Sequence, residues 1–262
     1  MTGFIGGGNM AEALIKGMTS QGMKDILVSE PREERRRELE RTYGIKTTDS
    51  NKEVVSLCDI LFLAVKPQNM DAVLDEVAGS ITEKKTVVSI AAGITLPYLE
   101  SKLRTKQLIR VMPNTPAIVQ EGMSVMALCG CFFGTQVNIV RSILMSIGKV
   151  LTLPEESMNA VTALSGSGPA FIALFTEAMI ESGEEMGLSS ADAAQLTIQT
   201  LLGTAKLLDT GMSPEKLRRM VTSPGGTTEA GLKVFEERDL KGMAGEALRA
   251  AGKRAEELGR RA

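Results

Sequence analysis

The first half of the chain alternates between short apolar runs and segments whose apolar residues recur at helical spacing. A short run opens the chain, and further runs lie at residues 25–31, 59–65, 86–92, 107–113, 122–128 and 148–153. Helical spacing is found behind the first run and near residues 32–42, 51–57, 70–79 and 95–104. Mostly apolar strands are typical of a parallel sheet covered on both faces. The alternation therefore predicts a doubly wound α/β fold.

The second half of the chain lacks strand-like runs from Pro154 onward. Only helical patterns follow, near residues 155–162, 168–187, 190–209, 213–221, 225–236 and 239–260. A chain of 262 residues is long enough for two domains. We therefore expect an α/β domain over residues 1–154 and an all-helical domain over residues 155–262.

One stretch of the helical half carries no positive charge. No Lys or Arg occurs between Lys149 and Lys206, and the helical pattern at residues 168–187 is apolar on most sides. A helix of this kind is normally buried, and two copies of the chain can bury it between them. Small residues at 165–170 would let another element approach closely. We therefore expect a homodimer formed through the helical domain.

The first apolar run is followed by Gly-Gly-Gly-Asn-Met-Ala at residues 6–11, which has the pattern G-x-G-x-x-A. Between a strand and a helix, this pattern is the fingerprint of a dinucleotide-binding turn. Gly6 permits the tight turn, Gly8 lets the backbone approach a pyrophosphate, and Ala11 lets the helix pack closely. The amino end of the helix would then face the phosphates with free N–H groups.

The end of the second strand carries two conflicting signals about the cofactor. Glu30 could accept hydrogen bonds from both adenine-ribose hydroxyls, which favours NAD(H). Ser29 and Arg32 could instead receive a 2′-phosphate, which favours NADP(H). The sequence leaves this choice open.

Three more strand ends carry candidate residues, because the carboxyl ends of parallel strands face the ligand in such sheets. They are the segments 65–67, 91–93 and 112–116. Lys66 either contacts a phosphate or ribose of the cofactor or is a solvated cation in a loop.

Far from these strands, residues 223–228 read Ser-Pro-Gly-Gly-Thr-Thr and directly precede a helical pattern. Ser223 is a good N-cap, and Pro224 suits the first helical position. Gly225 and Gly226 leave the backbone bare.

The N–H groups of Gly226, Thr227 and Thr228 would then point into open space and form an anion site without a cation. A carboxylate bound there would be held by these amides and by the hydroxyl of Ser223 or Thr227. Thr228 would lie beside the rest of the ligand. The alternative is an ordinary capped helix with a loose start.

The composition excludes several classes of function. The chain has no histidine, which removes Ser-His-Asp hydrolases and His-ligated metal enzymes. A net charge of -2 argues against a nucleic-acid surface, and Arg35–Arg37 are expected to form a solvated helix face. Cys58, Cys129 and Cys131 are expected to be small buried thiols, with no disulfide framework or metal site.

The expected cellular location follows from the lack of a membrane-spanning run and of a signal peptide. No apolar run reaches the ~18 residues of a membrane span, and the first strand begins too early for a signal peptide. We therefore expect a cytoplasmic protein that binds neither membrane nor nucleic acid.

Six motifs together resemble those of the Δ1-pyrroline-5-carboxylate reductases. They are GFIGGGNM, LFLAVKPQ, VVSIAAGIT, MPNTPA, LSGSGPAF and SPGGTTEAGL, and they occur in this order. The resemblance implies a Rossmann-type domain followed by a helical domain that dimerises by interleaving helices, with dimers often assembled into decamers. It also implies hydride transfer from NADPH or NADH to the C=N carbon of a five-membered cyclic imine, which gives L-proline. Such an imine can carry its own proton on nitrogen, so the reaction needs no histidine acid.

The resemblance also implies roles for individual residues. Thr228 would be the catalytic residue, with its hydroxyl bonded to the ring nitrogen, and Asn51 would lie near the adenosine ribose. The substrate-binding residues would be Ser223, Gly225, Gly226, Thr227 and Thr228. The cofactor-binding residues would be Gly6, Gly7, Gly8, Asn9, Met10, Ser29, Glu30, Arg32, Asn51, Ala64, Val65, Lys66, Pro67, Ala92, Gly93 and Asn114.

Two positions depart from the family pattern. Relatives often carry Ser or Thr in place of Glu30, and many carry Tyr in place of Phe171. Another enzyme hypothesis is an imine reductase for a related ring such as piperideine-2-carboxylate, and a third is a catalytically silent NADP-binding sensor. β-Hydroxyacid dehydrogenases share the two-domain plan, but they need a lysine that the first long helix of the second domain lacks.

Overall fold

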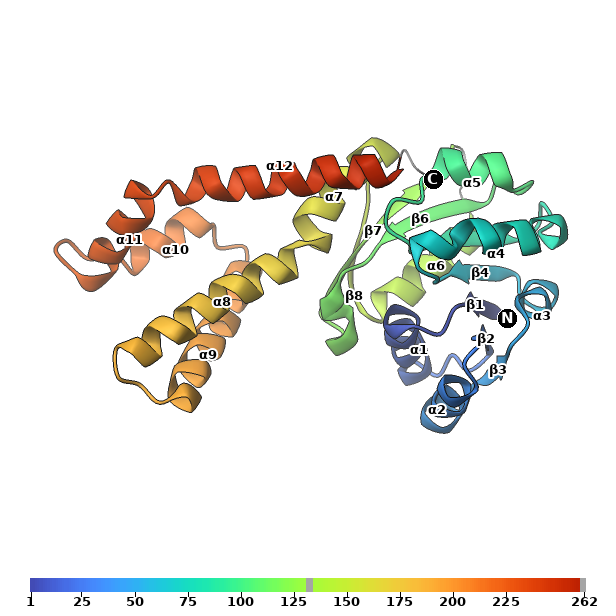
Figure 1. The fold of residues 1–262 in the computed structure, drawn as a ribbon, viewed down its shortest axis with the longest axis horizontal. Helices are drawn as coiled ribbons and strands as arrows, with labels where there is room; N and C mark the ends of the chain where they lie inside the picture. Colours follow the sequence, from blue (N-terminus) through green and yellow to red (C-terminus); the bar gives the residue numbers. More distant parts are fainter. Residues whose placement is uncertain (131–133, 260–262) are drawn as a thin grey trace. The chain divides into compact units, whose positions relative to one another are not determined.

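The computed structural model describes residues 1–130 and 134–259, and the chain in it divides into two compact units. Unit 1 comprises Met1–Ser167 and Ala250–Ala262, and unit 2 comprises Gly168–Arg249. Figure 1 shows the elements of both units in chain order. The predicted domain boundary after residue 154 stays a prediction, since these units describe compactness only.

Unit 1 is built on an eight-stranded sheet with the order β3-β2-β1-β4-β5-β6-β7-β8. All neighbouring strands are parallel except β6 and β7, which are antiparallel. The strands are β1 (Thr2–Ile5), β2 (Ile26–Ser29), β3 (Lys46–Thr48), β4 (Ile60–Leu63), β5 (Thr86–Ser89), β6 (Leu108–Met112), β7 (Gly122–Leu128) and β8 (Gly148–Thr152). The strand order reverses beside β1, which is the place where doubly wound sheets bind ligands.

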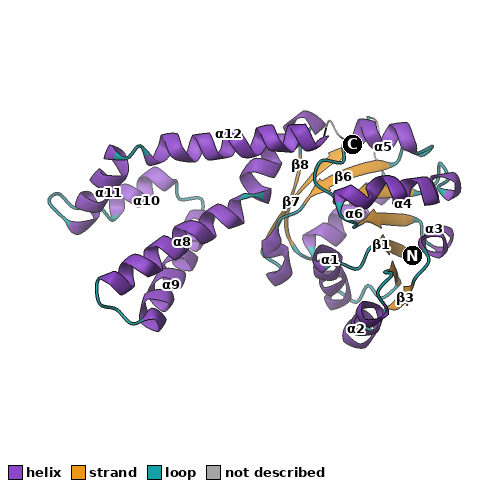
Figure 2. Ribbon diagram, viewed as in Figure 1, coloured by secondary structure: helices purple, strands orange, loops and turns teal. Residues whose placement is uncertain are grey.

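Helices cover both faces of this sheet (Figure 2). They are α1 (Asn9–Ser20), α2 (Glu33–Tyr43), α3 (Asn51–Leu57), α4 (Met70–Val77), α5 (Leu96–Lys102), α6 (Thr135–Met145) and α7 (Met158–Val161). Short 3-10 turns lie at η1 (Pro67–Asn69), η2 (Ala78–Ser80), η3 (Thr115–Val119) and η4 (Glu155–Ser157), and one π-helical turn lies at η5 (Thr162–Gly166).

Two apolar cores separate the helices from the sheet. On one face, α1, α2 and α6 pack around Phe4 and Phe62, whose rings stack with centroids 4.8 Å apart. On the other face, α3, α4 and α5 pack around residues such as Leu61 and Leu63. Successive residues of β4 thus enter opposite cores, which explains why the strand reads as an unbroken apolar run.

The Rossmann-type fold expected from the sequence is confirmed, with two elements that the pattern did not predict. Strand β3 has only three residues, Lys-Thr-Thr, and lies at the edge of the sheet, so it shows no apolar run. Helix α6 follows the segment 131–133, which lies outside the described residues together with Cys131. The other expected strands are present. Strand β7 has the expected bounds, and the others are shorter by one to three residues.

Unit 2 is helical throughout, as expected. It contains α8 (Gly168–Glu185), α9 (Ser190–Asp209), α10 (Pro214–Met220), α11 (Thr227–Glu237) and the first part of α12 (Leu240–Gly259). Phe175 of α8 meets Phe235 of α11 with ring centroids 6.1 Å apart. The amino ends of α9 and α10 are capped as their sequences suggest, because Ser189 and Ser213 each accept a backbone N–H with their side chain.

The helices of unit 2 leave much of their apolar surface uncovered within one chain. Leu174 is 66% exposed, Ile172 58%, Leu196 58% and Ile198 57%. The stretch Glu155–Glu185 is also long and apolar enough to cross a membrane by length and composition, with 6% of its most apolar window buried. A single chain therefore lacks the cover that such side chains normally have in water.

Candidate active site

The glycine turn is built where β1 ends. Gly6 has a φ of +101°, which favours glycine. A Cβ atom at Gly6 would lie 2.8 Å from the carbonyl oxygen of Ala64 and 3.1 Å from Cγ1 of Val65. The close approach of the ends of β1 and β4 therefore requires a glycine at this position, as the sequence motif predicts.

The helix that follows the turn presents bare backbone. Gly8 is the N-cap of α1, and a Cβ atom there would meet no heavy atom within 4 Å. Among the described residues, the N–H group of Gly8 has no hydrogen-bond partner. Ala11 is 1% exposed and packs in the core behind the turn, which is the close packing that the motif predicts. An open helix end of this kind fits the pyrophosphate of a dinucleotide.

Gly7, between these two glycines, is held by charged side chains. Its N–H donates to Oε2 of Glu30 at 3.1 Å, and its carbonyl oxygen accepts from Nε of Arg35 at 2.8 Å. The prediction that Arg35–Arg37 form a solvated face is therefore wrong for Arg35, whose side chain is 13% exposed. It is also wrong for Arg36, which donates to the carbonyl of Glu30 at 2.7 Å. Arg37 is exposed and pairs with Glu33, as expected.

Both carboxylate oxygens of Glu30 already have protein partners. Oε2 accepts the Gly7 N–H, while Oε1 accepts the N–H of Arg32 at 3.2 Å and its Nε at 2.8 Å. Burial raises the pKa of Glu30, but the hydrogen bonds from Arg32 and Gly7 outweigh this effect and hold the pKa below its ordinary value. Glu30 is therefore a charged, 5% exposed residue engaged inside the protein, and its oxygens are less available to ribose hydroxyls than the sequence suggested.

Ser29 and Asn51 also lie together at this end of the sheet. The Ser29 hydroxyl donates to Oδ1 of Asn51 at 2.6 Å, and Nδ2 of Asn51 donates to Glu76 at 2.7 Å. The exposed guanidinium of Arg32 lies next to them along the chain, with a side chain that is 68% exposed. The three residues predicted for the adenosine end of the cofactor thus share one edge of the sheet.

The remaining candidate cofactor residues follow the ends of β4, β5 and β6. The exposed Lys66 caps η1, and Gly93 has a φ of +80°. A Cβ atom at Gly93 would lie 3.1 Å from Cβ of Leu258 in the end of α12, so the chain packs closely at that point. Asn114 stabilises the loop between β6 and β7, because its Oδ1 accepts the N–H of Met123 at 2.8 Å.

Residues 223–228 fold as a turn followed by a helix, which differs from the expected capping. Gly226 donates its N–H to the carbonyl of Ser223 at 3.0 Å, Pro224 takes the second position, and Gly225 has a φ of +70°. These are the features of a type II turn. The helix α11 begins only at Thr227, with Gly226 as its N-cap. The prediction of Ser223 as N-cap and Pro224 as the first helical residue is therefore wrong, because the Pro-Gly pair closes a turn first.

The turn decides which backbone amides stay open. The N–H of Gly226 is used inside the turn, and the N–H of Gly225 donates to Oε2 of Glu229 at 2.7 Å. Among the described residues, the N–H groups of Thr227 and Thr228 have no partner. The open donors thus include the first two amides of α11, where the helix dipole also favours an anion.

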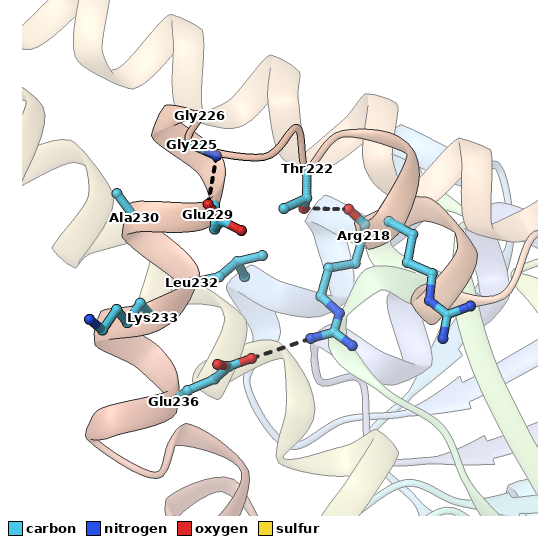
Figure 3. A pocket seen from close by; sticks show the side chains of 10 residues that line it. Arg218, Thr222, Gly225, Gly226, Glu229, Ala230, Leu232, Lys233 and Glu236 are labelled. Carbon is cyan, nitrogen blue, oxygen red and sulfur yellow. Dashed lines mark hydrogen bonds and ion pairs between the residues drawn. The ribbon is translucent and has the colours of Figure 1, made fainter.

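A pocket of about 680 Å³ opens beside this turn, between α10 and α11 (Figure 3). Gly225, Gly226 and Glu229 form one side of it, and Arg218 lies opposite, paired with Glu236 at 3.6 Å. Neither Thr227 nor Thr228 lines this pocket, so it lies on the Glu229 side of the turn.

Two side chains that shape these sites were missed by sequence reasoning. Arg35 lies 28 residues from the glycine that it holds, and no local pattern distinguishes it from its exposed neighbour Arg37. Glu229 had a local signal, since an acidic residue three positions after an N-cap often bonds back to the preceding backbone. That signal was hidden because Ser223 looked like the cap.

Of the two described cysteines, Cys58 lies in the core, and the partly buried Cys129 donates its thiol to Oε1 of Glu100 at 2.7 Å. Burial raises the pKa of Cys58 to about 11, so its thiol stays protonated at neutral pH. Neither belongs to the glycine turn or to the turn at 223–226.

Both halves of the chain match known families. Residues 155–258 match the pyrroline-5-carboxylate reductase dimerisation family, and residues 1–93 match the family of NADP oxidoreductases dependent on coenzyme F420. The pyrroline-5-carboxylate reductase of Synechocystis sp. is 40% identical over 99% of the chain and 98% of its own length. The enzyme of that name from Pseudomonas aeruginosa is 41% identical over 97% of the chain and 95% of its own length.

Solved structures agree with these matches. The pyrroline-5-carboxylate reductase of Coxiella burnetii superimposes with a TM-score of 0.91 at 38% identity, covering 98% of this chain and 97% of its own. The Plasmodium falciparum enzyme, solved with NADP bound, gives a TM-score of 0.88 at 30% identity, covering 98% and 97%. The chain therefore belongs to the pyrroline-5-carboxylate reductase family.

Proposed function

We propose that this chain reduces Δ1-pyrroline-5-carboxylate to L-proline with NADPH as the hydride donor. The observation that carries the proposal is the open amino end of α11 behind an intact Ser-Pro-Gly-Gly turn, in a chain of this family. The NADP bound to the Plasmodium falciparum relative supports the choice of cofactor, and so does the engagement of Glu30 inside the protein.

The bare end of α1 at Gly8 would hold the pyrophosphate of the cofactor. Ser29 and Arg32 would lie near its 2′-phosphate, and Asn51 near its adenosine ribose. The exposed cation Lys66 would lie near a phosphate or ribose. The nicotinamide supplies the hydride when the cofactor is bound. The other residues proposed to bind the cofactor are Gly6, Gly7, Asn9, Met10, Glu30, Ala64, Val65, Pro67, Ala92, Gly93 and Asn114, of which Pro67, Ala92 and Asn114 would lie on the nicotinamide side.

The substrate carboxylate would be held at the start of α11. The N–H groups of Thr227 and Thr228 supply two open donors, and the Ser223 hydroxyl supplies a third. The Thr228 hydroxyl would hold the ring nitrogen, which gains a lone pair when the C=N carbon accepts hydride. A protonated imine brings its own proton, so the chain's contribution is binding, orientation and the exclusion of water. Gly225 and Gly226 would shape the turn, and the N–H groups of Thr227 and Thr228 would donate to the carboxylate.

We also propose that the chain works as a cytoplasmic homodimer, and that dimers can assemble further into a decamer. The exposed apolar side chains of α8 and α9 and the match of residues 155–258 to a dimerisation family support the dimer. A second copy covering these helices accounts for the apolar stretch Glu155–Glu185 without a membrane. The start of that family match at residue 155 supports a domain boundary after residue 154.

The Thr228→Ala variant tests the catalytic assignment. We expect turnover of the imine to fall at least tenfold, the cost expected for a hydrogen bond that strengthens as the reaction proceeds, while the Kd of NADPH stays unchanged. Thr228→Ser should restore most of the activity. The Thr222 hydroxyl donates to the carbonyl of Arg218 at 2.6 Å, and Thr222→Ala should behave as the wild type. Undiminished turnover in Thr228→Ala would remove Thr228 from the mechanism.

The substrate is tested with a panel of cyclic imines, using NADPH oxidation at 340 nm as the readout. The five-membered ring should give the highest kcat/KM. A higher value for the six-membered piperideine-2-carboxylate would favour the alternative reductase, and the absence of oxidation with every imine would favour a cofactor-binding sensor.

A further inference from the structure

The Gly7 residue of the dinucleotide turn is bound by charged side chains on both of its peptide groups. Its N–H, in the peptide that joins Gly6 to Gly7, donates to Glu30 at 3.1 Å. Its carbonyl oxygen, in the peptide that joins Gly7 to Gly8, accepts from Nε of Arg35 at 2.8 Å. One bond comes from the residue that follows β2, and the other comes from α2.

The guanidinium of Arg35 is fully engaged by this arrangement. Besides Nε on Gly7, its NH1 donates to Glu38 at 2.7 Å and its NH2 donates to Glu12 of α1. Tyr43 adds a hydrogen bond to the other oxygen of Glu12 at 2.8 Å. With all three nitrogens used and a side chain only 13% exposed, Arg35 is placed to hold the protein backbone and not to bind a phosphate itself.

The geometry of the peptide bond links Arg35 to the pyrophosphate site. The carbonyl of Gly7 and the N–H of Gly8 belong to one planar trans peptide, so they point in opposite directions. Fixing the carbonyl oxygen on Arg35 therefore fixes the direction of the Gly8 N–H, which has no partner among the described residues. A run of three glycines has no side chains to resist rotation of this peptide, so the restraint must come from elsewhere in the fold.

We propose that Arg35 is a positioning residue for the dinucleotide, which aims the Gly8 N–H at the pyrophosphate by holding the Gly7 carbonyl. The inference rests on the proposed function, because it assumes that a dinucleotide binds at this turn. Glu30 adds a second restraint by holding the Gly7 N–H.

The test is a fluorescence titration of the purified full-length protein with NADPH, without imine. In Arg35→Ala we expect the Kd of NADPH to rise about tenfold, equivalent to about 1.4 kcal/mol. Arg35→Lys keeps the charge but not the planar fork that reaches three partners, so its Kd should rise as well. Arg37→Ala removes one charge from the exposed face of the same helix and should leave the Kd unchanged.

A second ligand separates aiming of the pyrophosphate from general damage. Adenosine 2′-monophosphate carries the 2′-phosphate but no pyrophosphate, so its Kd should change less than twofold in Arg35→Ala, well below the change for NADPH. Titrations are made well below the Tm of each variant. If Arg35→Ala fails to fold, the Kd of Arg35→Lys tests the inference instead.

The possible results separate a failure of the Arg35 inference from a failure of the proposed function. Wild-type binding of NADPH with an unchanged Kd in Arg35→Ala would overturn the inference alone. So would wild-type affinity in Arg35→Lys, since charge and not the held carbonyl would then explain the effect, and so would equal losses for NADPH and adenosine 2′-monophosphate. A wild-type protein that binds no NADPH would overturn the proposed function itself.

Discussion

The ion pair between Arg110 and Glu155 gives a prediction whose magnitude can be worked from the structure. Arg110 lies on β6 inside the sheet of unit 1, with a side chain that is 4% exposed, and its NH1 donates to Oε1 of Glu155 at 2.6 Å. The same oxygen accepts the N–H of Leu96 at 3.2 Å at the start of α5. Glu155 follows β8, so one carboxylate joins the sheet, α5 and the segment that leads to the helical domain.

The perturbation is Glu155→Gln, which keeps the size of the side chain and removes its charge. Breaking a buried ion pair typically costs about 3–5 kcal/mol, because the partner charge is left uncompensated. Glu155 is 22% exposed, so water will screen part of this loss. We therefore expect the free energy of unfolding to fall by about 2–3 kcal/mol, which lowers the Tm by roughly 5–10 °C in a chain of this size.

The assay is urea unfolding at fixed protein concentration, followed by circular dichroism, with the m-value compared between variants. The double variant Arg110→Met with Glu155→Gln removes the stranded charge and should recover stability to within about 1 kcal/mol of the wild type. Two results would refute the reasoning. One is a fall in the free energy of unfolding of less than about 1 kcal/mol in Glu155→Gln, and the other is a double variant less stable than Glu155→Gln. Either result would mean that the pair does not behave as the buried ion pair that the distances and exposure indicate.

Three further predictions follow from particular contacts. Glu229→Ala releases the Gly225 N–H, so steady-state kinetics should show the KM for the imine raised about threefold and the KM for NADPH unchanged. Glu229→Gln should return the KM for the imine to its wild-type value. A lower KM for the imine in Glu229→Ala would mean that Glu229 competes with the substrate. In Glu12 and Glu30, burial raises the pKa but hydrogen bonds outweigh it and hold the folded values below 4.5. Their contribution to stability is therefore complete above pH 4.5 and is lost as the pH falls through the folded values, so the Tm measured from pH 6 to pH 3 should fall less steeply in Glu12→Gln. Gly17→Ala would bring a Cβ atom within 2.8 Å of Cγ2 of Ile147, and calorimetry should show a loss of about 1–3 kcal/mol despite the better helix propensity of alanine.

The sequence predicted those parts of the fold that depend on local periodicity. The apolar runs at β1, β2, β4, β5 and β6 are readable because each strand is buried on both faces. The glycine pattern at residues 6–11 is readable because it combines a positive φ with close backbone approach, and each of these demands a particular residue type. Strand β3 was not predicted, because an edge strand of three polar residues leaves no such trace.

The candidate site was predicted in its residue types but not in its contacts. The sequence placed glycines and hydroxyls at residues 223–228, yet the type II turn there moved the helix start to Thr227 and tied Gly225 to Glu229. Two capping arrangements compete for the same six residues, and the choice between them depends on where the chain enters the turn. The sequence pattern alone does not fix that direction.

The amino-acid sequence by itself determined the class of fold, the dinucleotide turn and the family, because each depends on the spacing of a few residue types that are close together in the chain. Only the tertiary structure decided which charged side chains serve the site. Arg35 and Arg37 are two residues apart in one Glu/Arg-rich helix, yet one holds Gly7 and the other faces solvent. Their difference arises from how α2 packs against the turn after β1, and a contact between elements 28 residues apart is set by the packing of the whole sheet and not by any local pattern.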